Sequence, residues 1–372
     1  MTASPMTQTL STTIGRWARL GPYYAMFPVD FAFDIVATYS KPGQSLLDPF
    51  AGRASSVYAA AAQGRTACGI EINPIGWLYG QIKLRPALES DVIARVQHLA
   101  EVASGRPSER LHALPPFFSA CFSPNVLQFL LAARDVLQWR TDHVDATVMA
   151  FILVYLHGKM PDALSNQMRQ GKAMSPEYSI RWWRDRALTP PDIDPVRFLR
   201  QRITWRYGKG VPNFSNAEVR LGDSIMVLSE IAGEIASGQR KRFDLLFTSP
   251  PYYSVTHYHN DQWLRLWMLG GIERPTAMQG IWQGRFESQP AYRMLLQIVF
   301  RSCAAIMSRK ATIYIRTDAR AFTFETTMEC LRDAFPKKTF RTEMQPFRKR
   351  TQTALFGDKS EKPGEIDILS LP

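Results

Sequence analysis

Residues 249–252 read Ser-Pro-Pro-Tyr and close an apolar run, 244–248, that is typical of a buried parallel strand. Two prolines cannot continue a β-ladder because they lack the N–H donor, so the chain must leave the sheet there. Because proline fixes φ, we expect the Ser249 hydroxyl and the Pro250 carbonyl to be rigid acceptors at the carboxyl edge of the sheet, where open α/β folds bind ligands. Two such acceptors suit the two N–H groups of a planar amine, and the ring of Tyr252 offers a face on which a base can stack.

A second set of residues predicts a nucleoside site at the same edge. Residues 46–56, Leu-Leu-Asp-Pro-Phe-Ala-Gly-Arg-Ala-Ser-Ser, predict a strand that ends in a glycine-containing turn. Residues 67–73 predict a short strand whose Glu71 lies about 20 residues beyond that turn, a spacing that suits the two ribose hydroxyls of a nucleoside cofactor. Asp223 follows a further expected strand at 218–221, where an isolated aspartate is more typical of a helix N-cap.

These segments together resemble the amino-methyltransferases of DNA, whose fourth motif is (Asp/Asn/Ser)-Pro-Pro-Tyr and whose first motif is Asp-Pro-Phe-x-Gly-x-Gly. The serine version is most similar to the N4-cytosine members. The resemblance implies an α/β, Rossmann-like class I methyltransferase fold: a seven-stranded, mostly parallel sheet with an antiparallel closing strand, plus a largely helical insertion. It also implies S-adenosylmethionine as the cofactor. The order of the motifs, with the cofactor half first, is similar to the group called alpha.

The resemblance also implies roles for individual residues. The catalytic residues would be Ser249, Pro250, Pro251 and Tyr252. The cofactor-binding residues would be Phe27, Asp48, Pro49, Phe50, Ala51, Gly52, Glu71, Asp223 and Thr248. Residues 21–28, with a helix expected over 31–39, resemble the family's tenth motif, which wraps the methionine end of the cofactor. Ala54 stands where the family has its second glycine, and if φ is positive there its methyl group is expected to crowd the cofactor.

A long segment interrupts the expected fold. About 145 residues separate Asn73 from the strand at 218–221, whereas a βαβ crossover needs about a dozen. Helices are expected over 124–133 and 144–157 within this segment. We therefore expect the methyltransferase domain in two parts, 1–83 and 218–372, and a helical, basic insertion at 84–217. Downstream we expect a helix at 292–307, a strand at 311–316, and a closing antiparallel pair at 339–344 and 366–371 joined by the loop 345–363.

The distribution of charge indicates a polyanionic partner. The net charge of +12 favours nucleic acid or an anionic surface. Residues 157–210 hold eleven Lys and Arg against five acids, interleaved with tryptophan and tyrosine. Arginines contact phosphates and guanine edges, and aromatic rings stack or wedge between bases. The alternative is a solvated helical face whose tryptophans belong to the core. We predict that double-stranded DNA is bound by Arg169, Lys172, Arg181, Arg184 and Arg186.

Other features bear on location and metal binding. The longest strongly apolar run, 149–156, is too short to span a bilayer, and residues 1–14 lack the apolar core of a signal peptide. The four cysteines are scattered, as is ordinary for reduced thiols. We expect a cytoplasmic, nucleoid-associated protein of prokaryotic or phage type that meets no membrane. His257 and His259 lack further ligands nearby, so no metal is expected.

The expected reaction is site-specific transfer of a methyl group to the exocyclic N4 of cytosine in duplex DNA by base flipping. N4 is conjugated with the ring and is a poor nucleophile, so the two acceptors must orient it. Three alternatives remain: N6 of adenine, methylation of RNA guanine N2 or of a protein amide, and a non-catalytic DNA-binding module, the last motivated by Ala54. No convincing nuclease motif is present, so DNA cleavage would require a cognate restriction endonuclease on another chain.

Overall fold

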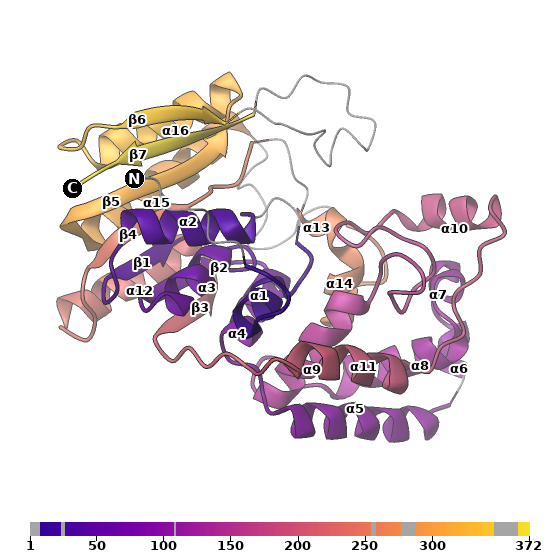
Figure 1. Ribbon diagram of the computed structural model, residues 1–372. Coiled ribbons are helices and arrows are strands. Elements are labelled where there is room, and N and C mark those ends of the chain that lie inside the picture. The colour runs from indigo at the N-terminus through magenta and orange to yellow at the C-terminus, as the bar shows by residue number, and fades with distance from the viewer. Residues whose placement is uncertain (1–7, 24–26, 108, 254–257, 277–287, 346–363) are drawn as a thin grey trace.

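The computed structural model describes residues 8–23, 27–107, 109–253, 258–276, 288–345 and 364–372. Figure 1 shows two lobes, one built on a sheet and one built from helices. The strands are β1 (Ser45–Asp48), β2 (Thr66–Glu71), β3 (Ala217–Leu221), β4 (Phe243–Thr248), β5 (Met307–Asp318), β6 (Arg341–Gln345) and β7 (Glu365–Ser370).

The seven strands form one sheet in the order β3-β2-β1-β4-β5-β7-β6. Neighbours from β3 to β5 pair in parallel, whereas β7 runs antiparallel to both β5 and β6. The predicted fold class is therefore confirmed. After β1 the chain builds outward through β2 and β3 and then returns to place β4 on the other side of β1. Ligands of open α/β sheets bind at the carboxyl ends of the strands beside such a reversal.

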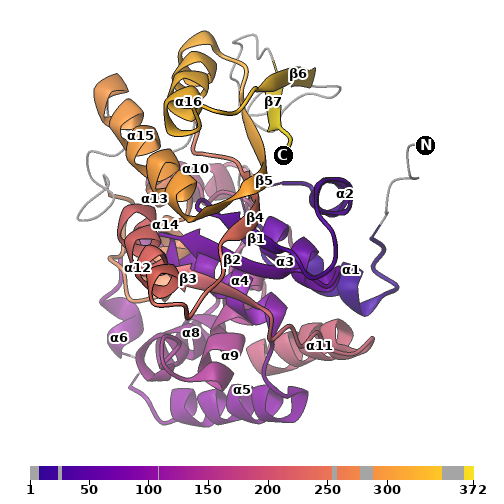
Figure 2. The same cartoon turned by 90° about the vertical axis from the view of Figure 1, so that its left-hand side faces the viewer.

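Helices cover both faces of the sheet (Figure 2). Adjacent residues of a strand point to opposite faces, so Leu46 packs into one apolar cluster and Leu47 into the other. The first face carries α1 (Thr13–Ala18), α2 (Val29–Tyr39), α3 (Ser55–Ala62) and α4 (Pro74–Leu84). The second face carries α12 (Ser224–Ala236), α15 (Gln289–Ile306) and α16 (Ala321–Ala334). Burial on both faces explains why the strands read as continuous apolar runs.

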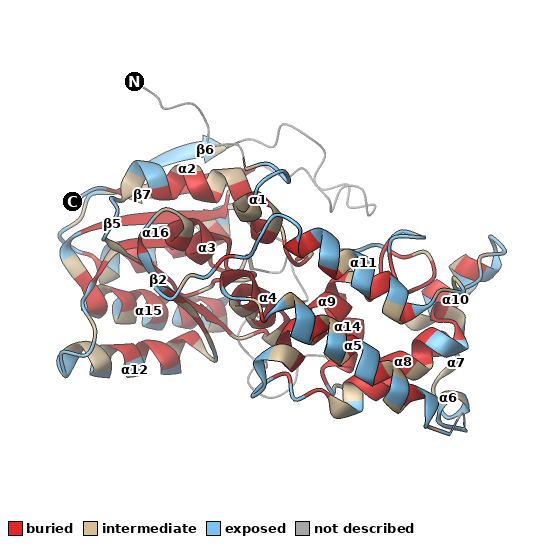
Figure 3. Cartoon of the chain, turned by 60° about the horizontal axis from the view of Figure 1, so that its bottom comes forward, coloured by how far each residue is buried: buried red, intermediate tan, exposed pale blue. Residues whose placement is uncertain are grey.

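The helical lobe lies between α4 and β3 in the chain. Its helices are α5 (Glu89–Ser104), α6 (Glu109–His112), α7 (Pro116–Cys121), α8 (Pro124–Val136), α9 (His143–Tyr155), α10 (Pro176–Arg184) and α11 (Pro195–Tyr207). Figure 3 shows buried residues along the inner sides of these helices, and the apolar cluster of the first sheet face continues into them.

A second segment of the chain also belongs to this lobe, namely α13 (Tyr258–Asp261) and α14 (Trp263–Met268). The rings of Trp263 and Phe117 lie 4.9 Å apart, and those of Trp267 and Phe118 lie 4.6 Å apart. The lobe thus recruits residues that follow the Ser-Pro-Pro-Tyr segment, beyond the expected insertion at 84–217.

The helices expected over 124–133, 144–157 and 292–307 correspond to α8, α9 and α15. The strand expected at 311–316 lies within β5, which begins at Met307 directly after α15. Most of the loop expected at 345–363 lies outside the described residues. Within the part of the chain that is described, no helix combines the length and apolarity that crossing a membrane requires. The same described residues contain no cluster of three His, Cys, Asp or Glu side chains able to hold a metal ion.

Helix α4 lies very close to the turn that follows β1. A Cβ atom at Gly76 would stand 2.6 Å from the carbonyl oxygen of Gly52 and 3.1 Å from Cγ of Glu71. One helical turn further, a Cβ atom at Gly80 would stand 3.0 Å from Cβ of Ala54. The turn and Glu71 therefore pack against α4 at positions where a side chain larger than that of glycine would clash.

Gly76→Ala should destabilise the protein, although alanine is favoured over glycine in a helix by about 1 kcal/mol. The added methyl group would meet the Gly52 carbonyl and displace the turn. Gly233→Ala is the matched control, because Gly233 lies within α12 and a Cβ atom there meets nothing within 4 Å. Urea unfolding should show a lower free energy of unfolding for Gly76→Ala and a slightly higher one for Gly233→Ala. Equal effects would contradict the close approach of α4.

Candidate active site

The predicted cofactor-binding acids meet at one edge of the sheet. Asp48 ends β1, Glu71 ends β2 and Thr248 ends β4, and these three strands are neighbours. Asp223 lies two residues beyond β3 and caps α12, where its carboxylate accepts a 2.9 Å hydrogen bond from the amide of Ile225. Asp223 is therefore the N-cap of α12, as is typical of an isolated aspartate at such a position. Carboxyl ends of parallel strands place all four residues on the side where this fold binds ligands.

Asp48 is a buried carboxylate that is saturated by protein donors. Its Oδ1 accepts hydrogen bonds from the Thr248 hydroxyl at 2.5 Å and the Phe50 amide at 3.1 Å, and its Oδ2 accepts one from the Ser56 hydroxyl. Burial raises the pKa of Asp48 to about 6, although these donors oppose the shift. The Asp48 carboxylate thus joins the end of β1 to the end of β4 and also fixes the turn that follows β1.

The turn after β1 is fixed by further contacts. The Pro49 carbonyl accepts a 2.5 Å hydrogen bond from the Ser224 hydroxyl, and the Ala51 amide donates to the Ile70 carbonyl at 2.9 Å. Gly52 adopts a φ of +55°. These contacts bind the turn to β2 and to the start of α12.

Ala54 also adopts the left-handed conformation, with φ +60° and ψ +43°, at a cost of about 1–2 kcal/mol for a residue with a Cβ atom. The positive φ that the expectation of crowding required is therefore present, and crowding of the cofactor itself stays a prediction. The side chain is wholly buried, and the methyl group lies against α4 at Gly80. The missing family glycine therefore affects backbone strain and helix packing.

Glu71 is buried and is paired with backbone groups. Its Oε1 accepts a 2.7 Å hydrogen bond from the Asn73 amide. Burial raises the pKa of Glu71 to about 8, and the nearby Asp48 adds to the shift, while backbone amides oppose it. Among the described residues no Lys, Arg or His forms an ion pair with it. A carboxylate in this position is a strong acceptor for the hydroxyl groups of a nucleoside.

Aromatic residues border this edge. The ring of Phe27 stacks on that of Phe247 in β4, with centroids 4.6 Å apart and planes inclined by 18°. Phe27 also packs on Phe31 of α2 at 5.5 Å. Phe50 is half-buried against the other face of the sheet. Residues 24–26 of the expected tenth motif lie outside the described residues.

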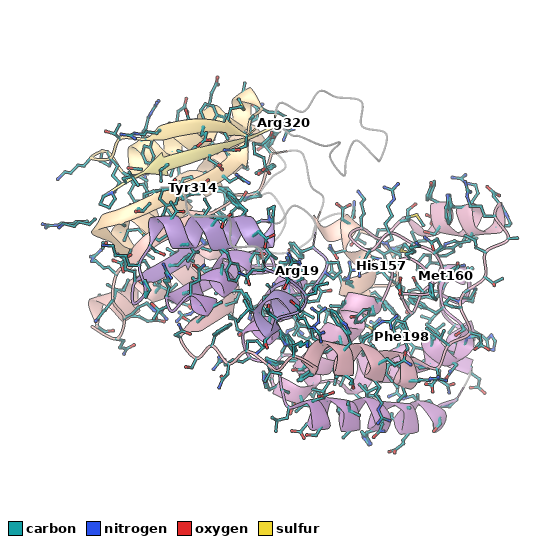
Figure 4. The ribbon with its side chains drawn as sticks, in the orientation of Figure 1. Arg19, His157, Met160, Phe198, Tyr314 and Arg320 are labelled. Carbon is teal, nitrogen blue, oxygen red and sulfur yellow. The ribbon has the colours of Figure 1, made fainter. Side chains whose placement is uncertain are left out.

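Two side chains from outside β4 hold the backbone around the Ser-Pro-Pro-Tyr segment. The Tyr292 hydroxyl of α15 donates to the Pro251 carbonyl at 2.9 Å. Arg320, which Figure 4 labels beyond the end of β5, donates to the Tyr253 carbonyl at 2.7 Å. The backbone after β4 is therefore braced on both sides of Tyr252, and Tyr292 and Arg320 carry no sequence signal that would have identified them.

A hydrogen-bond chain leads from Ser249 to β7. The Ser249 hydroxyl donates to the Tyr252 hydroxyl over a long 3.4 Å, and Tyr252 donates to Oε1 of Glu365 at 3.0 Å. Arg316 lies 3.4 Å from the other oxygen of Glu365 and pairs with Asp367 through two 2.7 Å hydrogen bonds. Burial raises the pKa of Glu365. A hydroxyl oxygen has two lone pairs, so Ser249 can accept a hydrogen bond from a bound amine.

The predicted DNA-binding residues fall into two groups. Arg181, Arg184 and Arg186 are exposed on or just after α10, at the outer end of the helical lobe (Figure 1). The guanidinium of Arg186 lies over the Trp182 ring at 4.4 Å. Arg169 and Lys172 instead lie on the loop that faces the sheet lobe, and Lys172 pairs with Asp261 at 2.5 Å.

The two interpretations of the interleaved tryptophans each describe part of the structure. Trp183 is buried against Phe117, 5.7 Å between centroids, as the core interpretation expects. Trp205 is 42% exposed and lies beneath the Arg16 guanidinium at 4.5 Å. The surface of the helical lobe therefore presents paired arginine and tryptophan side chains.

The seven-stranded sheet is the one predicted for a class I methyltransferase fold. Residues 6–75 match the DNA methylase family model of the N6/N4 type, which confirms the predicted resemblance to the N4-cytosine and N6-adenine enzymes. The match covers the first motif and Glu71, and it supports methyltransferase activity with S-adenosylmethionine as the methyl donor. No curated protein matches the sequence.

Three similar solved structures share low sequence identity with this chain. The rRNA methyltransferase aviRa from Streptomyces viridochromogenes is 12% identical with a TM-score of 0.35, over 100% of this chain and 96% of that one. TrmN from Thermus thermophilus is 10% identical with a TM-score of 0.33, over 96% and 52%. A SAM-dependent methyltransferase from Agrobacterium tumefaciens is 10% identical with a TM-score of 0.34, over 92% and 59%. The chain thus spans little more than half the length of the last two.

Glu71→Gln should stabilise the cofactor-free protein at high pH and weaken cofactor binding. The folded protein holds a proton on Glu71 up to about pH 8, whereas the ordinary pKa is 4.5, so Glu71 lowers the free energy of unfolding progressively as pH rises between these values. Glutamine has no charge to bury. Thermal unfolding should show a larger gain for the variant at pH 9 than at pH 5.

At pH 9, where Glu71 is ionised, calorimetry should show about 10- to 100-fold weaker S-adenosylmethionine binding by the variant, the loss expected when hydrogen bonds to a charged acceptor become neutral. If the stability gain does not change with pH, the pKa of Glu71 is not raised in the folded protein. Unchanged cofactor affinity would remove Glu71 from the cofactor site.

Proposed function

We propose that this protein transfers a methyl group from S-adenosylmethionine to the exocyclic N4 of cytosine in double-stranded DNA, with the target base flipped out of the helix. The observation that carries the proposal is the position of Ser249 directly after the end of β4, beside the edge that holds Asp48 and Glu71. The match of residues 6–75 to a DNA methylase family supports DNA as the substrate. The helical lobe would be the target-recognition region, in an alpha-like order of motifs.

The mechanism depends on positioning the amine. The Ser249 hydroxyl oxygen and the Pro250 carbonyl each accept one N–H of the amino group, which directs the nitrogen lone pair away from the plane of the base. S-adenosylmethionine, when bound, supplies the electrophilic methyl group. Such positioning can supply about 7–11 kcal/mol of the barrier. The ring of Tyr252, anchored through its hydroxyl to Glu365, would stack on the flipped base.

The hydrogen-bond chain also provides a path for the released proton. Once the C–N bond has formed, the nitrogen carries one proton too many and becomes acidic. Ser249 can accept this proton while passing its own to Tyr252, and Tyr252 can pass its proton to Glu365. Burial raises the pKa of Glu365, which favours the protonated carboxyl that results. After these transfers Ser249 and Tyr252 are again neutral hydroxyl groups, and Glu365 carries the proton as a neutral carboxyl group.

Methylated DNA digested to nucleosides and analysed by mass spectrometry should contain N4-methylcytosine. Ser249→Ala should lose most of the turnover, because one of the two amine acceptors is removed, whereas its affinity for S-adenosylmethionine should stay close to that of the parent. If the product is N6-methyladenine, the target base is adenine, the main alternative to cytosine. Near-normal turnover of Ser249→Ala would remove Ser249 from the mechanism, and methylation only of RNA or protein would overturn the DNA substrate.

Replacing Arg181, Arg184 and Arg186 together by glutamine should weaken binding to duplex DNA and flatten its salt dependence. Each lost phosphate contact changes the log–log slope by about 0.9, so three contacts would change it by roughly 2–3 units. These side chains are exposed and form no ion pair with Asp185 or Asp194 in the described structure, so the fold should tolerate the change.

The matched control replaces Arg309, Lys310 and Lys337 by glutamine. These residues are exposed; Arg309 and Lys310 lie near the amino end of β5, opposite the catalytic edge, so the net charge changes equally away from the candidate site. Fluorescence anisotropy over a range of salt concentrations would measure both variants. Equal slopes for the two triple variants would exclude α10 as a specific DNA-binding surface.

A further inference from the structure

A cavity of about 910 Å³ lies at the junction of the two lobes. Its wall is formed by residues 19–23 after α1, by the turn after β1, and by the loop 158–172 of the helical lobe. Figure 4 labels Arg19 at this junction, with His157 and Met160 on the helical side. Six basic side chains line the cavity: Arg19, Arg53, Lys159, Arg169, Lys172 and Arg206. Asp162 is the one acid among its described lining residues.

Two of these arginines are buried without an acidic partner. Arg53, 5% exposed, donates to the Gly21 carbonyl at 2.9 Å, and its Nε has no partner. Arg206, also 5% exposed, donates to the Arg16 carbonyl, and its Nε likewise has no partner. Neither forms an ion pair with any described residue. Burying an unpaired charge costs several kcal/mol, so the fold alone gives no reason for this arrangement.

Burial and mutual repulsion disfavour the charged forms of the cations around the cavity, so a bound anion would stabilise them. Lys83 of α4 is fully buried with an unpartnered Nζ, and burial together with Arg53 and Arg206 lowers its pKa well below the ordinary value. Burial and the charges of Arg19 and Arg206 lower the pKa of Arg53 to about 10. The acid that lines the cavity is already engaged, since Asp162 pairs with Arg202 at 3.4 Å, and the lining Lys172 pairs with Asp261 at 2.5 Å.

We propose that this cavity binds a phosphate group of the nucleic-acid strand that carries the target base. The proposal rests on the proposed function and names a contact site for its substrate. Guanidinium groups match the geometry of phosphate and can bind it through two parallel hydrogen bonds. The volume lies near the upper end of the range for ligand pockets, so a nucleotide unit fits, with Tyr23 and Tyr155 in the wall beside it.

The cavity also has a suitable position. Arg53 belongs to the turn that follows Asp48 and Gly52, whereas Arg206 belongs to α11 of the helical lobe. A phosphate held between them would connect the catalytic lobe to the lobe that reads the target. It would offset the repulsion between two buried cations, so binding of the strand would draw the lobes together.

Arg206→Met provides the first test, with Arg200→Met as the matched control. Both residues lie on α11 and lose one positive charge, but Arg200 is exposed and outside the cavity. Inorganic phosphate should raise the melting temperature of the parent and of Arg200→Met, and should have little effect on Arg206→Met. Affinity for duplex DNA should fall about tenfold in Arg206→Met, and the salt slope should decrease by about 0.9.

A second variant covers the case in which Arg206→Met fails to fold, because Arg206 also donates to the Arg16 carbonyl. Lys159 is exposed and lines the cavity, so Lys159→Met should fold and should weaken phosphate and duplex binding. If phosphate stabilises the parent and these variants equally, the proposal is wrong. Phosphate binding that depends on Arg206, with duplex affinity unchanged, would overturn the nucleic-acid assignment and identify a site for a free phosphate compound.

S-adenosylmethionine binding is measured in parallel. A large loss of cofactor affinity in Arg206→Met would assign the cavity to the cofactor and overturn the proposal. Because these readouts are binding measurements, they are independent of methyl transfer. If duplex binding depends on Arg206 but no methylated DNA is formed, the proposed function alone is rejected. If methylation depends on Ser249 but the cavity variants bind phosphate and duplex DNA like the parent, the cavity proposal alone is rejected.

Discussion

The hydrogen bond between Thr248 and Asp48 is the interaction on which the rest of the site depends. At 2.5 Å it joins the carboxyl ends of β4 and β1, the two strands between which the sheet reverses its order. The same carboxylate holds the turn after β1 through Ser56 and the amide of Phe50. Ser249 follows Thr248 directly, so one buried carboxylate couples the turn proposed to bind the cofactor to the residue proposed to bind the amine.

The junction between the lobes accommodates buried cations in two different ways. Arg265 of α14 is wholly buried and donates to the carbonyls of Leu153 and Gln170 and to the side chain of Gln262, at 2.9, 2.6 and 2.8 Å. Neutral oxygens therefore satisfy its guanidinium, and it fastens α14 to the helical lobe. Arg53 and Arg206 keep unpartnered nitrogens instead. The first arrangement is complete within the protein, whereas the second leaves donors for the anion that we propose.

Much of the fold could be predicted because it depends on local patterns. The apolar run at 244–248 followed by two prolines located β4, and the long interval after Asn73 located the helical lobe. The site was less accessible, because its contacts join residues distant in the chain. No local pattern connects Tyr252 with Glu365, which are 113 residues apart. The direction of the Ala54 methyl group depends on the packing of α4, which a departure from a motif does not reveal.

The antiparallel direction of β7 determines which of its residues can reach the active edge. Parallel strands offer this edge their last residues, such as Asp48, Glu71 and Thr248. A strand that runs the opposite way arrives there with its first residue, and in this chain that residue is Glu365. Strand reversal therefore delivers a carboxylate from β7 to the Ser-Pro-Pro-Tyr segment, so that β7 contributes to the candidate site as well as to the sheet.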